Sequence, residues 1–400
     1  MSVDHRKLGR ELDLFDSDPL IGAGLPFWLP AGAAARHAVE SYLYELERRN
    51  GYQHVHSPAL GKRQMYEMSG HWQNFSEDMF PPMRLGGDEL VLRPSQCPHH
   101  ALIFKARQRS YRDLPLRIAE VGPMYRAERS GVLGGLARVR SIQLDDAHNF
   151  CALDQVGDEV AAVLRLMRVS HAALGFEPSS FRLSLRGDSG KYAGGDAMWA
   201  RAESLLRGAL GAEGIEFEAV PGEAAFYGPK IDVQIEDSAG REWSLATIQI
   251  DFHQPAQFDL SYAAADGGRE RPVMVHQSLI GSMERLFGHL IEVHQGAFPV
   301  WYAPVQIDVL PLGAGQADAA RAFAAAAVRA GLRAEVHEEG SLGARIRSAA
   351  ERKIPYAGIV GEREVADGLI ALRLRDGGQV PPMPQAEAIA MIASAGRPEL

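Results

Sequence analysis

The alternation of strand-like and helix-like segments changes near residue 300, and this change constrains the fold more than any other feature. Residues 298–304 contain two prolines and mark a boundary. The segments after it alternate between strand and helix patterns: residues 305–310, 317–330, 334–337, 342–353, 356–360 and 369–374. Alternation at this spacing predicts a small α/β domain of about a hundred residues. We place this domain at residues 299–400.

The larger first part, residues 1–298, has a different pattern. Residues 32–49 place Val39, Leu43 and Leu46 on one face of a helix, with charged residues opposite. A helix stop at an Asn-Gly pair, a short strand-like run and a proline follow this helix.

Strand patterns then dominate the middle of this first part. Residues 117–122 and 138–144 are typical of two strands around the glycine-rich loop at 130–135, and further strands lie within residues 225–251. Residues 279–294 predict a long helix. The first part is therefore expected to be an antiparallel-sheet α+β domain, which makes the whole chain α+β.

Composition excludes several classes of protein. The chain has 400 residues, of which 46% are hydrophobic and 23% charged, as in a globular protein with room for two domains. No apolar run is long enough to span a bilayer, and residues 1–7 lack the apolar core of a secretory signal. Cys97 and Cys151 cannot form a disulfide framework, so we expect a cytoplasmic protein. The net charge of −9 counts mildly against extensive nucleic-acid binding, although a local basic patch would suffice.

Three candidate metal ligands stand far apart in the sequence. Cys97 precedes a proline, His148 follows an Asp-Asp-Ala sequence, and His276 lies in a strand-like Val-His-Gln segment. One thiolate and two imidazoles suit Zn²⁺, and three protein ligands leave a fourth position for a substrate. Spacing alone is weak support, because the chain has 14 histidines and most of them are expected to be structural.

Arginines and a glutamate surround the glycine-rich loop. Arg126 and Glu128 precede it, Arg138 and Arg140 follow it, and Arg285 lies on the later helix. Several arginines that converge on one site supply the fixed charge and forked donors that a triphosphate needs. The plainer alternative for any one of them is a solvated surface ion pair, and a glycine-rich loop alone commonly marks a hairpin.

Short motifs follow one another along nearly the whole chain. They are Asp4-His5-Arg6-Lys7, Ser69-Gly70-His71-Trp72, Cys97-Pro98, Ser110-Tyr111-Arg112-Asp113-Leu114-Pro115-Leu116-Arg117, Arg138-Val139-Arg140 with Asp145-Asp146-Ala147-His148, Ala225-Phe226-Tyr227-Gly228-Pro229-Lys230-Ile231-Asp232, and Gly281-Ser282-Met283-Glu284-Arg285. In this order they resemble the motifs of the threonyl-tRNA synthetases, which are class II aminoacyl-tRNA synthetases. The class II signature motifs would correspond to the helix and strand ending at Pro58, to the hairpin at 126–140 and to the Arg285 helix.

The resemblance implies a zinc site that selects the amino acid. Cys97, His148 and His276 would hold one Zn²⁺ per chain, and threonine would chelate it through its amino group and side-chain hydroxyl. Asp146 would accept a hydrogen bond from that hydroxyl. Valine has no hydroxyl and would leave these polar groups unpaired, which rejects it strongly.

The resemblance also implies an ATP site, with Mg²⁺ accompanying the nucleotide. Arg126 would bind the α-phosphate and the substrate carboxylate, which neutralises charge during the attack on phosphorus. Glu128 would bind the adenine amino group, Arg138 and Arg285 the outer phosphates, and Ser282 belongs to the same site.

The remaining implied site residues concern the amino acid and its transfer. Tyr227, Lys230 and Gln249 would line the substrate pocket. His71 would assist acyl transfer to the tRNA ribose and join Arg126 and Arg285 as a catalytic residue. Packing of His71 against the following tryptophan is an equally open alternative.

Several positions depart from the family pattern. The resemblance begins at the family's catalytic domain, so the usual N-terminal domains, including the editing domain, are expected to be absent. Serine differs from threonine by one methyl group, worth about 1–3 kcal/mol of discrimination, so errors with serine are expected. The departures around the site spare the zinc ligands: Ser95, Gln96, Gly134, Leu144, Ser244 and Ala246. Leu144 replaces a polar partner of the substrate carboxylate, at a cost of about 1 kcal/mol or a changed substrate orientation.

The second domain resembles the family's anticodon-binding domain, but its expected RNA-reading surface is changed. Its departures from the family's basic and polar residues are Glu338, Glu339, Ser341, Ala366 and Asp376. Carboxylates at such a surface repel an RNA backbone.

Two functions therefore remain open. The first is a threonine–tRNA ligase without an editing domain, acting on threonine, ATP and tRNA. The alternative is a repurposed relative that transfers activated threonine to a carrier protein or a small-molecule amine. A catalytically inactive binding module is disfavoured, because the zinc and ATP positions are intact. By resemblance we also expect a homodimer, formed in part by the helix at 32–49.

Overall fold

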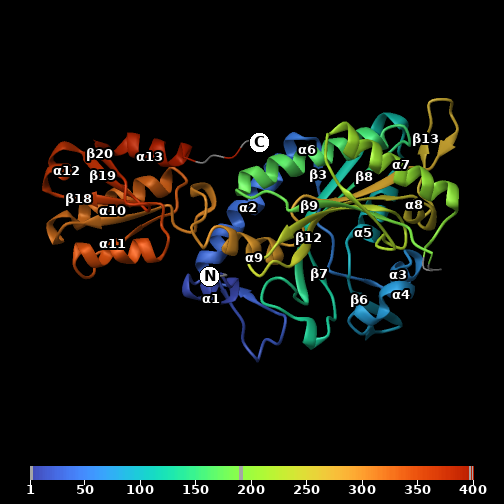
Figure 1. The fold of residues 1–400 in the computed structure, drawn as a ribbon, viewed down its shortest axis with the longest axis horizontal. Helices are drawn as coiled ribbons and strands as arrows, with labels where there is room; N and C mark the ends of the chain where they lie inside the picture. The colour runs from blue at the N-terminus through green and yellow to red at the C-terminus, as the bar shows by residue number, and fades with distance from the viewer. Residues whose placement is uncertain (1–2, 189–191, 396–397, 399) are drawn as a thin grey trace.

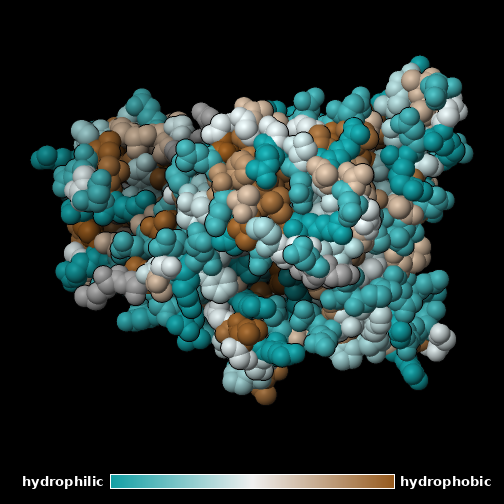
Figure 2. Space-filling model, turned by 45° about the vertical axis from the view of Figure 1, so that its right-hand side comes forward, coloured by the Kyte–Doolittle hydropathy of each residue, from teal (hydrophilic) through white to brown (hydrophobic). Residues whose placement is uncertain are grey.

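The protein consists of two bodies that are built on separate sheets (Figure 1). The computed structural model describes residues 3–188, 192–395, 398 and 400. The larger body lies on the right of Figure 1, and the smaller one, coloured orange to red, on the left. Among the described residues, none of the helices combines the length and apolar character needed to cross a membrane. The face seen in Figure 2 is largely hydrophilic, and its apolar residues form separate small patches.

An eight-stranded sheet forms the centre of the larger body. Its strand order is β10-β9-β11-β12-β15-β8-β7-β3. The neighbours are antiparallel except for the two edge pairs, β10 with β9 and β3 with β7. The strands are β3 (Tyr52–His54), β7 (Leu116–Tyr125), β8 (Ser141–Cys151), β9 (Ser180–Leu185), β10 (Glu218–Pro221), β11 (Lys230–Glu236), β12 (Glu242–Asp251) and β15 (Val273–Ser278).

Long helices cover one face of this sheet. They are α2 (Pro30–Arg49), α6 (Val156–Leu174), α7 (Asp196–Ala212) and α9 (Met283–Val293). Helix α6 packs on β12 and β15, α7 on α6 and β9, and α9 on β8. Apolar side chains from these helices and strands form the largest core cluster. The N-terminal segment adds α1 (His5–Glu11), β1 (Phe15–Asp16) and β2 (Phe27–Trp28), and α1 packs on α9.

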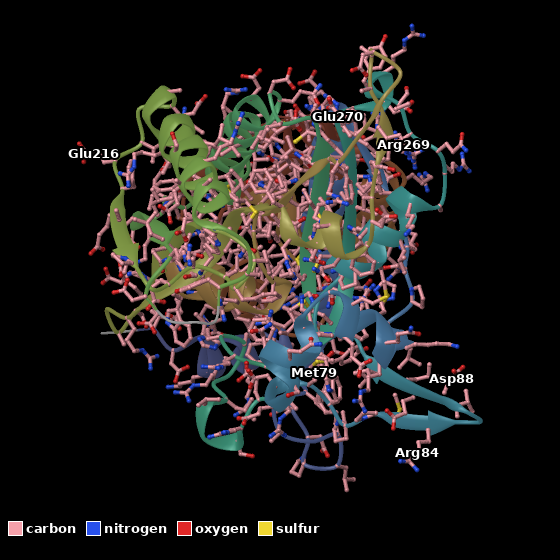
Figure 3. The ribbon with its side chains drawn as sticks, turned by 90° about the vertical axis from the view of Figure 1, so that its right-hand side faces the viewer. Met79, Arg84, Asp88, Glu216, Arg269 and Glu270 are labelled. Carbon is pink, nitrogen blue, oxygen red and sulfur yellow. The ribbon has the colours of Figure 1, made fainter. Side chains whose placement is uncertain are left out.

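The other face of the sheet is only partly covered. Short elements lie on this side: β4 (Leu60–Lys62), α3 (Arg63–Met68), α4 (His71–Phe75), β5 (Met83–Leu85), β6 (Asp88–Leu92), α5 (Cys97–Lys105), α8 (His253–Gln257), β13 (Tyr262–Ala263) and β14 (Arg269–Glu270). In Figure 3, Arg84 and Asp88 mark the β5–β6 hairpin at the bottom, and Arg269 and Glu270 mark the β13–β14 hairpin at the top. Helix α5 is anchored by Phe104, which stacks on Phe150 of β8.

The smaller body has a five-stranded sheet of order β17-β16-β18-β19-β20. The first three strands are parallel, and β19 and β20 are antiparallel to their neighbours. Its elements are β16 (Ile307–Pro311), α10 (Ala317–Arg329), β17 (Ala334–Val336), α11 (Leu342–Glu351), β18 (Tyr356–Val360), α12 (Glu362–Asp367), β19 (Leu369–Leu374), β20 (Gln379–Pro384) and α13 (Gln385–Ser394). Short 3₁₀ turns complete the fold: Ser76–Asp78, Tyr111–Asp113, Ser130–Val132, Val300–Tyr302 and Ala314–Gln316.

The predicted fold class is confirmed, whereas several element boundaries were wrong. The strand expected at residues 138–144 begins at Ser141 and continues to Cys151. The helix expected from residue 279 begins only at Met283, because the Ser282 hydroxyl caps it by accepting from the backbone N–H of Arg285. The sequence patterns also missed β20 and α13.

Candidate active site

A cavity of about 280 Å³ lies over the centre of the eight-stranded sheet, on the partly covered face. It brings together most of the residues predicted to form the site: Cys97, Arg126, Asp146, His148, Tyr227, Lys230, Gln249, His276, Ser282 and Arg285. The predicted residues His71, Glu128 and Arg138 do not line the cavity but contact residues close to it. The roles of all these residues remain proposals.

The strand register explains why distant residues meet here. Lys230 pairs with Gln249, Gln249 with His276, and His276 with His148, so one row crosses four strands. Opposite residues of antiparallel strands share a face, which directs these side chains into the same cavity. Successive residues on a strand alternate, so Asp146 lies on the His148 face while its neighbour Asp145 faces the helices.

The candidate metal ligands form a compact group. One potential ligand atom from each of Cys97, His148 and His276 lies within 4.8 Å of the others, and all three residues are buried. Nε2 of His148 is 3.0 Å from Nδ1 of His276. Nε2 of His276 is 2.9 Å from an oxygen of the Asp251 carboxylate, which accepts a hydrogen bond from its N–H. This contact turns Nδ1 of the His276 ring towards the group.

This donor set fits zinc. Burial, together with the neighbouring His276 and His100, holds the pKa of His148 well below its usual value, so this imidazole is neutral and available as a ligand. A thiolate and two imidazoles are preferred by Zn²⁺, whereas Mg²⁺ and Ca²⁺ prefer sites of oxygen ligands. Asp251 supplies the carboxylate that commonly orients a zinc-bound histidine.

His71 lies at the edge of this group and is held by hydrogen bonds. Its Nδ1 is 2.8 Å from the hydroxyl of Ser69, and its Nε2 is 2.9 Å from the hydroxyl of Ser95. Its Nε2 is also 3.6 Å from Sγ of Cys97. The Trp72 ring instead lies against the guanidinium of Arg63, so hydrogen bonds rather than packing on Trp72 orient His71.

The opposite end of the cavity is positively charged. Arg126 is exposed and forms no ion pair with a carboxylate of the described residues. Arg285 donates to backbone carbonyls of Ser244 and Ala137, at 2.6 and 3.1 Å. Burial and the nearby charges of Arg126 and Arg138 lower the pKa of Arg285 to about 10. Cations placed together at this energetic cost favour an anionic ligand.

The other predicted ATP-binding residues form ion pairs or hydrogen bonds with residues of the same site. Arg138 forms an ion pair with Glu128 at 2.8 Å. Ser282 uses its hydroxyl oxygen to cap α9, which positions Arg285 three residues later. In the substrate wall, the hydroxyl of Tyr227 contacts the side-chain oxygen of Gln249.

The sequence patterns did not identify several residues that form hydrogen bonds or ion pairs with the predicted site residues. Asp251, which orients His276, stands 25 positions earlier in the sequence, and nothing in its local pattern identified it. Ser95 was noticed only as a departure from the family pattern, yet its hydroxyl lies between His71 and Cys97. Lys230 pairs with Asp232 at 2.7 Å, a partner that the alternation along β11 could have indicated.

Two family models match the chain. The first is the tRNA synthetase class II core domain (G, H, P, S and T), over residues 82–294. The second is the anticodon binding domain, over residues 306–395. The first match spans more than half of the chain and contains all of the residues that line the cavity.

Similar proteins and structures agree with these matches. The threonine–tRNA ligases of Geobacillus sp. and Listeria monocytogenes are each 46% identical over 92% of the chain, which spans 58% of their length. A structure described as the RNA binding domain of threonyl-tRNA synthetase from Cryptosporidium parvum is 33% identical, with a TM-score of 0.94 and 99% of both chains covered. A putative threonyl-tRNA synthetase from Aeropyrum pernix is 29% identical, with a TM-score of 0.84, covering 98% of this chain and 94% of its own. The matched core model and the 33% identity across a whole solved chain show that the protein belongs to the class II aminoacyl-tRNA synthetases, in the threonyl-tRNA synthetase family.

Proposed function

We propose that the chain activates L-threonine with ATP and transfers the threonyl group to tRNA. The observation that carries this proposal is the single cavity that joins a Cys-His-His group at one end to unpaired positive charge at the other. An amino acid bound at the first end presents its carboxylate to a triphosphate at the second. The names of the similar ligases and the match to an anticodon binding domain support the same reading.

The amino-acid end selects for a hydroxyl group in this proposal. Cys97, His148 and His276 would hold Zn²⁺, which supplies a Lewis acid for the amino group and hydroxyl of threonine. Asp146 accepts the hydrogen bond of that hydroxyl. A substrate without the hydroxyl leaves Asp146 unpaired in a buried site, so valine is rejected more strongly than its shape alone would require.

The nucleotide end stabilises charge during activation. A carboxylate oxygen of threonine attacks the α-phosphorus of ATP, the bond to the bridging oxygen breaks, and pyrophosphate leaves. Arg126 and Arg285 neutralise the negative charge that develops on the phosphoryl oxygens, together with the Mg²⁺ that accompanies ATP. Glu128 and Arg138 complete the proposed ATP site, and their ion pair sets the position of each before the substrate binds.

The second step transfers the acyl group. A ribose hydroxyl of the tRNA attacks the carbonyl carbon of the adenylate, and AMP leaves with the electrons of the broken bond. We propose that His71, whose Nε2 lies beside the hydroxyl of Ser95, accepts the proton of the attacking hydroxyl. Tyr227, Lys230 and Gln249 line the amino-acid side of the cavity and hold the reacting group in register.

We propose that the smaller body binds RNA through an altered surface. Two residues near the expected anticodon surface form hydrogen bonds within the chain. The Ser341 hydroxyl caps α11, and Arg375 donates to the carbonyl of Phe298 at 2.6 Å. Glu338 pairs with Arg321, whereas Glu339 is exposed without an ion pair among the described residues. We propose that tRNA binding here depends weakly on the anticodon.

The proposed homodimer uses α2. This helix buries Val39, Leu43 and Leu46 in the core of its own chain and leaves its other face accessible. Tyr44 on that accessible face is half exposed and stacks on His54. The support for dimer formation is the family membership rather than any contact within the chain.

Pyrophosphate exchange tests the activation step. Replacing Arg126 with alanine removes charge stabilisation at the triphosphate and is expected to lower threonine-dependent exchange by at least about 100-fold. Arg129→Ala is the matched control, because this exposed arginine on the same loop forms an ion pair with Glu77 at the surface and with no other carboxylate of the described residues. It should leave exchange nearly unchanged. Full exchange by the Arg126 variant would overturn the assignment of the nucleotide end.

A further inference from the structure

A second layer of buried polar groups lies behind the His148 ring. Nδ1 of His148 is 2.7 Å from Nδ1 of His100, on α5. Nε2 of His100 is 3.3 Å from the carboxylate of Glu120, on β7. His100 is fully buried and Glu120 is 4% exposed. The contacts form a line from Glu120 through His100 to His148, on the side of His148 that faces away from Cys97 and His276.

Glu120 is fixed as an acceptor at the start of this line. The guanidinium of Arg93, also fully buried, donates to it at 3.1 Å, and the backbone N–H of Ser57 donates at the same distance. The Ser57 hydroxyl donates to the other carboxylate oxygen. Burial alone would raise the pKa of Glu120, but the hydrogen bonds from His100 and Ser57 and the charge of Arg93 lower it to about 2. Glu120 is therefore ionised and can only accept protons in hydrogen bonds.

The proton positions on both rings follow from this acceptor. Since Glu120 only accepts, the nitrogen of His100 that faces it carries the proton. Arg93 already balances the charge of Glu120, so a neutral His100 leaves this buried cluster uncharged, as burial requires. The Nδ1 of a neutral His100 then bears a lone pair and accepts from Nδ1–H of His148. The remaining nitrogen of His148, Nε2, must bear its lone pair towards His276, 3.0 Å away.

His276 is oriented by a separate contact, because its Nε2 lies 2.9 Å from the Asp251 carboxylate. Its Nδ1 then faces Nε2 of His148 at 3.0 Å, beside the thiol of Cys97. Each ring is thus held through the nitrogen that faces away from the candidate metal position.

We propose that His100 and Glu120 are positioning residues that hold the proton of His148 on Nδ1 and thereby aim its Nε2 at the metal. This inference rests on the zinc site of the proposed function and adds the groups that keep one of its ligands in the binding form. Helix α5 carries both a candidate ligand and a positioning residue, because Cys97 begins the helix and His100 follows three residues later on the same side. A shift of α5 would move a ligand and its neighbour's support together.

Zinc affinity and the cobalt(II) spectrum of the full chain test the proposal. His100→Leu removes the acceptor, and the affinity for Zn²⁺ in competition with a chelator is expected to fall about 10- to 100-fold. The absorption bands of the Co²⁺-loaded protein should shift, because His148 no longer presents a fixed nitrogen. His100→Asn keeps an acceptor oxygen near the position of Nδ1 and should bind within a few-fold of the unmodified chain.

The matched control is His99→Leu. His99 is buried on the same turn of α5 but forms no hydrogen bond with His148, so its loss should leave the zinc affinity and the cobalt spectrum unchanged. Because His100→Leu can fail to fold, Glu120→Gln provides a second measurement: it keeps the shape, removes the charge that holds the His100 proton, and should also weaken zinc binding.

The outcomes separate this inference from the function on which it rests. If the unmodified chain binds zinc while His100→Leu and Glu120→Gln bind it equally tightly with unchanged cobalt spectra, the network only stabilises the fold and the inference is overturned. An unmodified chain that binds no zinc overturns the metal site itself. Weaker binding in both variants, with partial or full recovery in His100→Asn, supports the proposal.

Discussion

Replacing Glu47 with glutamine should change how the stability of the larger body depends on pH. Glu47 lies on α2, is fully buried, and accepts from Nε2 of His54 at 2.7 Å. It also interacts with the buried carboxyl of Asp145, which accepts the backbone N–H groups of Leu279 and Ile280. Burial is the largest cause of the raised pKa of both carboxyl groups, and the pKa of Asp145 lies well above its usual value despite its backbone donors. Both groups therefore favour the protonated form near neutral pH, and Glu47→Gln removes the contribution of Glu47 alone.

The sign and size of the effect follow from the pKa of this group. Burial raises the pKa of Glu47 from 4.5 to about 8. A raised folded-state pKa contributes stability that is fully present below the unfolded value and is lost as the pH rises towards the folded value. From about pH 5.5 to about pH 7.5 the folded chain holds nearly one more proton than the unfolded chain at this position, which lowers the free energy of unfolding by about 2–3 kcal/mol.

Glutamine has the same shape and keeps a donor for Asp145 and an acceptor for His54, but it does not titrate. The free energy of unfolding of Glu47→Gln, relative to the unmodified chain, should therefore rise by about 2–3 kcal/mol over this interval. Urea unfolding followed by tryptophan fluorescence measures this difference. All five tryptophans lie at or before residue 301, so the signal reports the larger body.

Glu45→Gln on the same helix is the control. Glu45 lies beside Arg48 and Arg49, whose hydrogen bonds lower its pKa to about 2, so it is ionised in both states throughout the interval. Its substitution should give a difference that does not vary with pH. A constant difference for Glu47→Gln as well would refute the reasoning, because it would mean that the folded chain holds no extra proton at Glu47.

Four further predictions concern the metal, the substrate, the RNA and the assembly. Elemental analysis should find zinc in the unmodified chain and in Cys151→Ala, which removes the other buried thiol, but not in Cys97→Ala; equal zinc in both variants would contradict the ligand assignment. Pyrophosphate exchange should be fastest with threonine, slower with serine and nearly absent with valine, and comparable rates for valine would exclude selection through Asp146. Glu339→Lys should strengthen tRNA binding more at low salt than at high salt, since the gain is attraction to phosphates, and an unchanged affinity would remove this surface from the RNA interface. Light scattering should give a dimer at micromolar concentration, and a monomer would count against the interface through α2.

The sequence predicted the fold class and the helix and strand types well where periodicity was strong. The apolar face of α2 and the alternation of strands and helices after residue 305 depend on neighbours in the sequence, which the patterns contain. The boundaries of β8 and α9 could not be predicted in the same way. The start of α9 depends on the Ser282 cap and on the bonds of the preceding turn to Asp145, which lies more than a hundred residues earlier. The domain boundary at residues 298 and 299 stays a prediction.

For the candidate site, too, the sequence indicated the residues but not the contacts between distant segments. Cys97, His148 and His276 were identified by residue type and motif, since a thiol and two imidazoles suggest a metal wherever they meet. That they do meet depends on the register of β8 with β15, and a shift by one residue would turn His148 to the helix-covered face.

The groups behind the candidate ligands could not be predicted from the sequence. Asp251 contacts His276 directly, whereas Glu120 is joined to His148 only through His100, and all of these contacts depend on distances that only the folded chain defines. A sequence motif can therefore identify the candidate ligand residues of a metal site. The hydrogen bonds that orient each side chain depend on the tertiary structure.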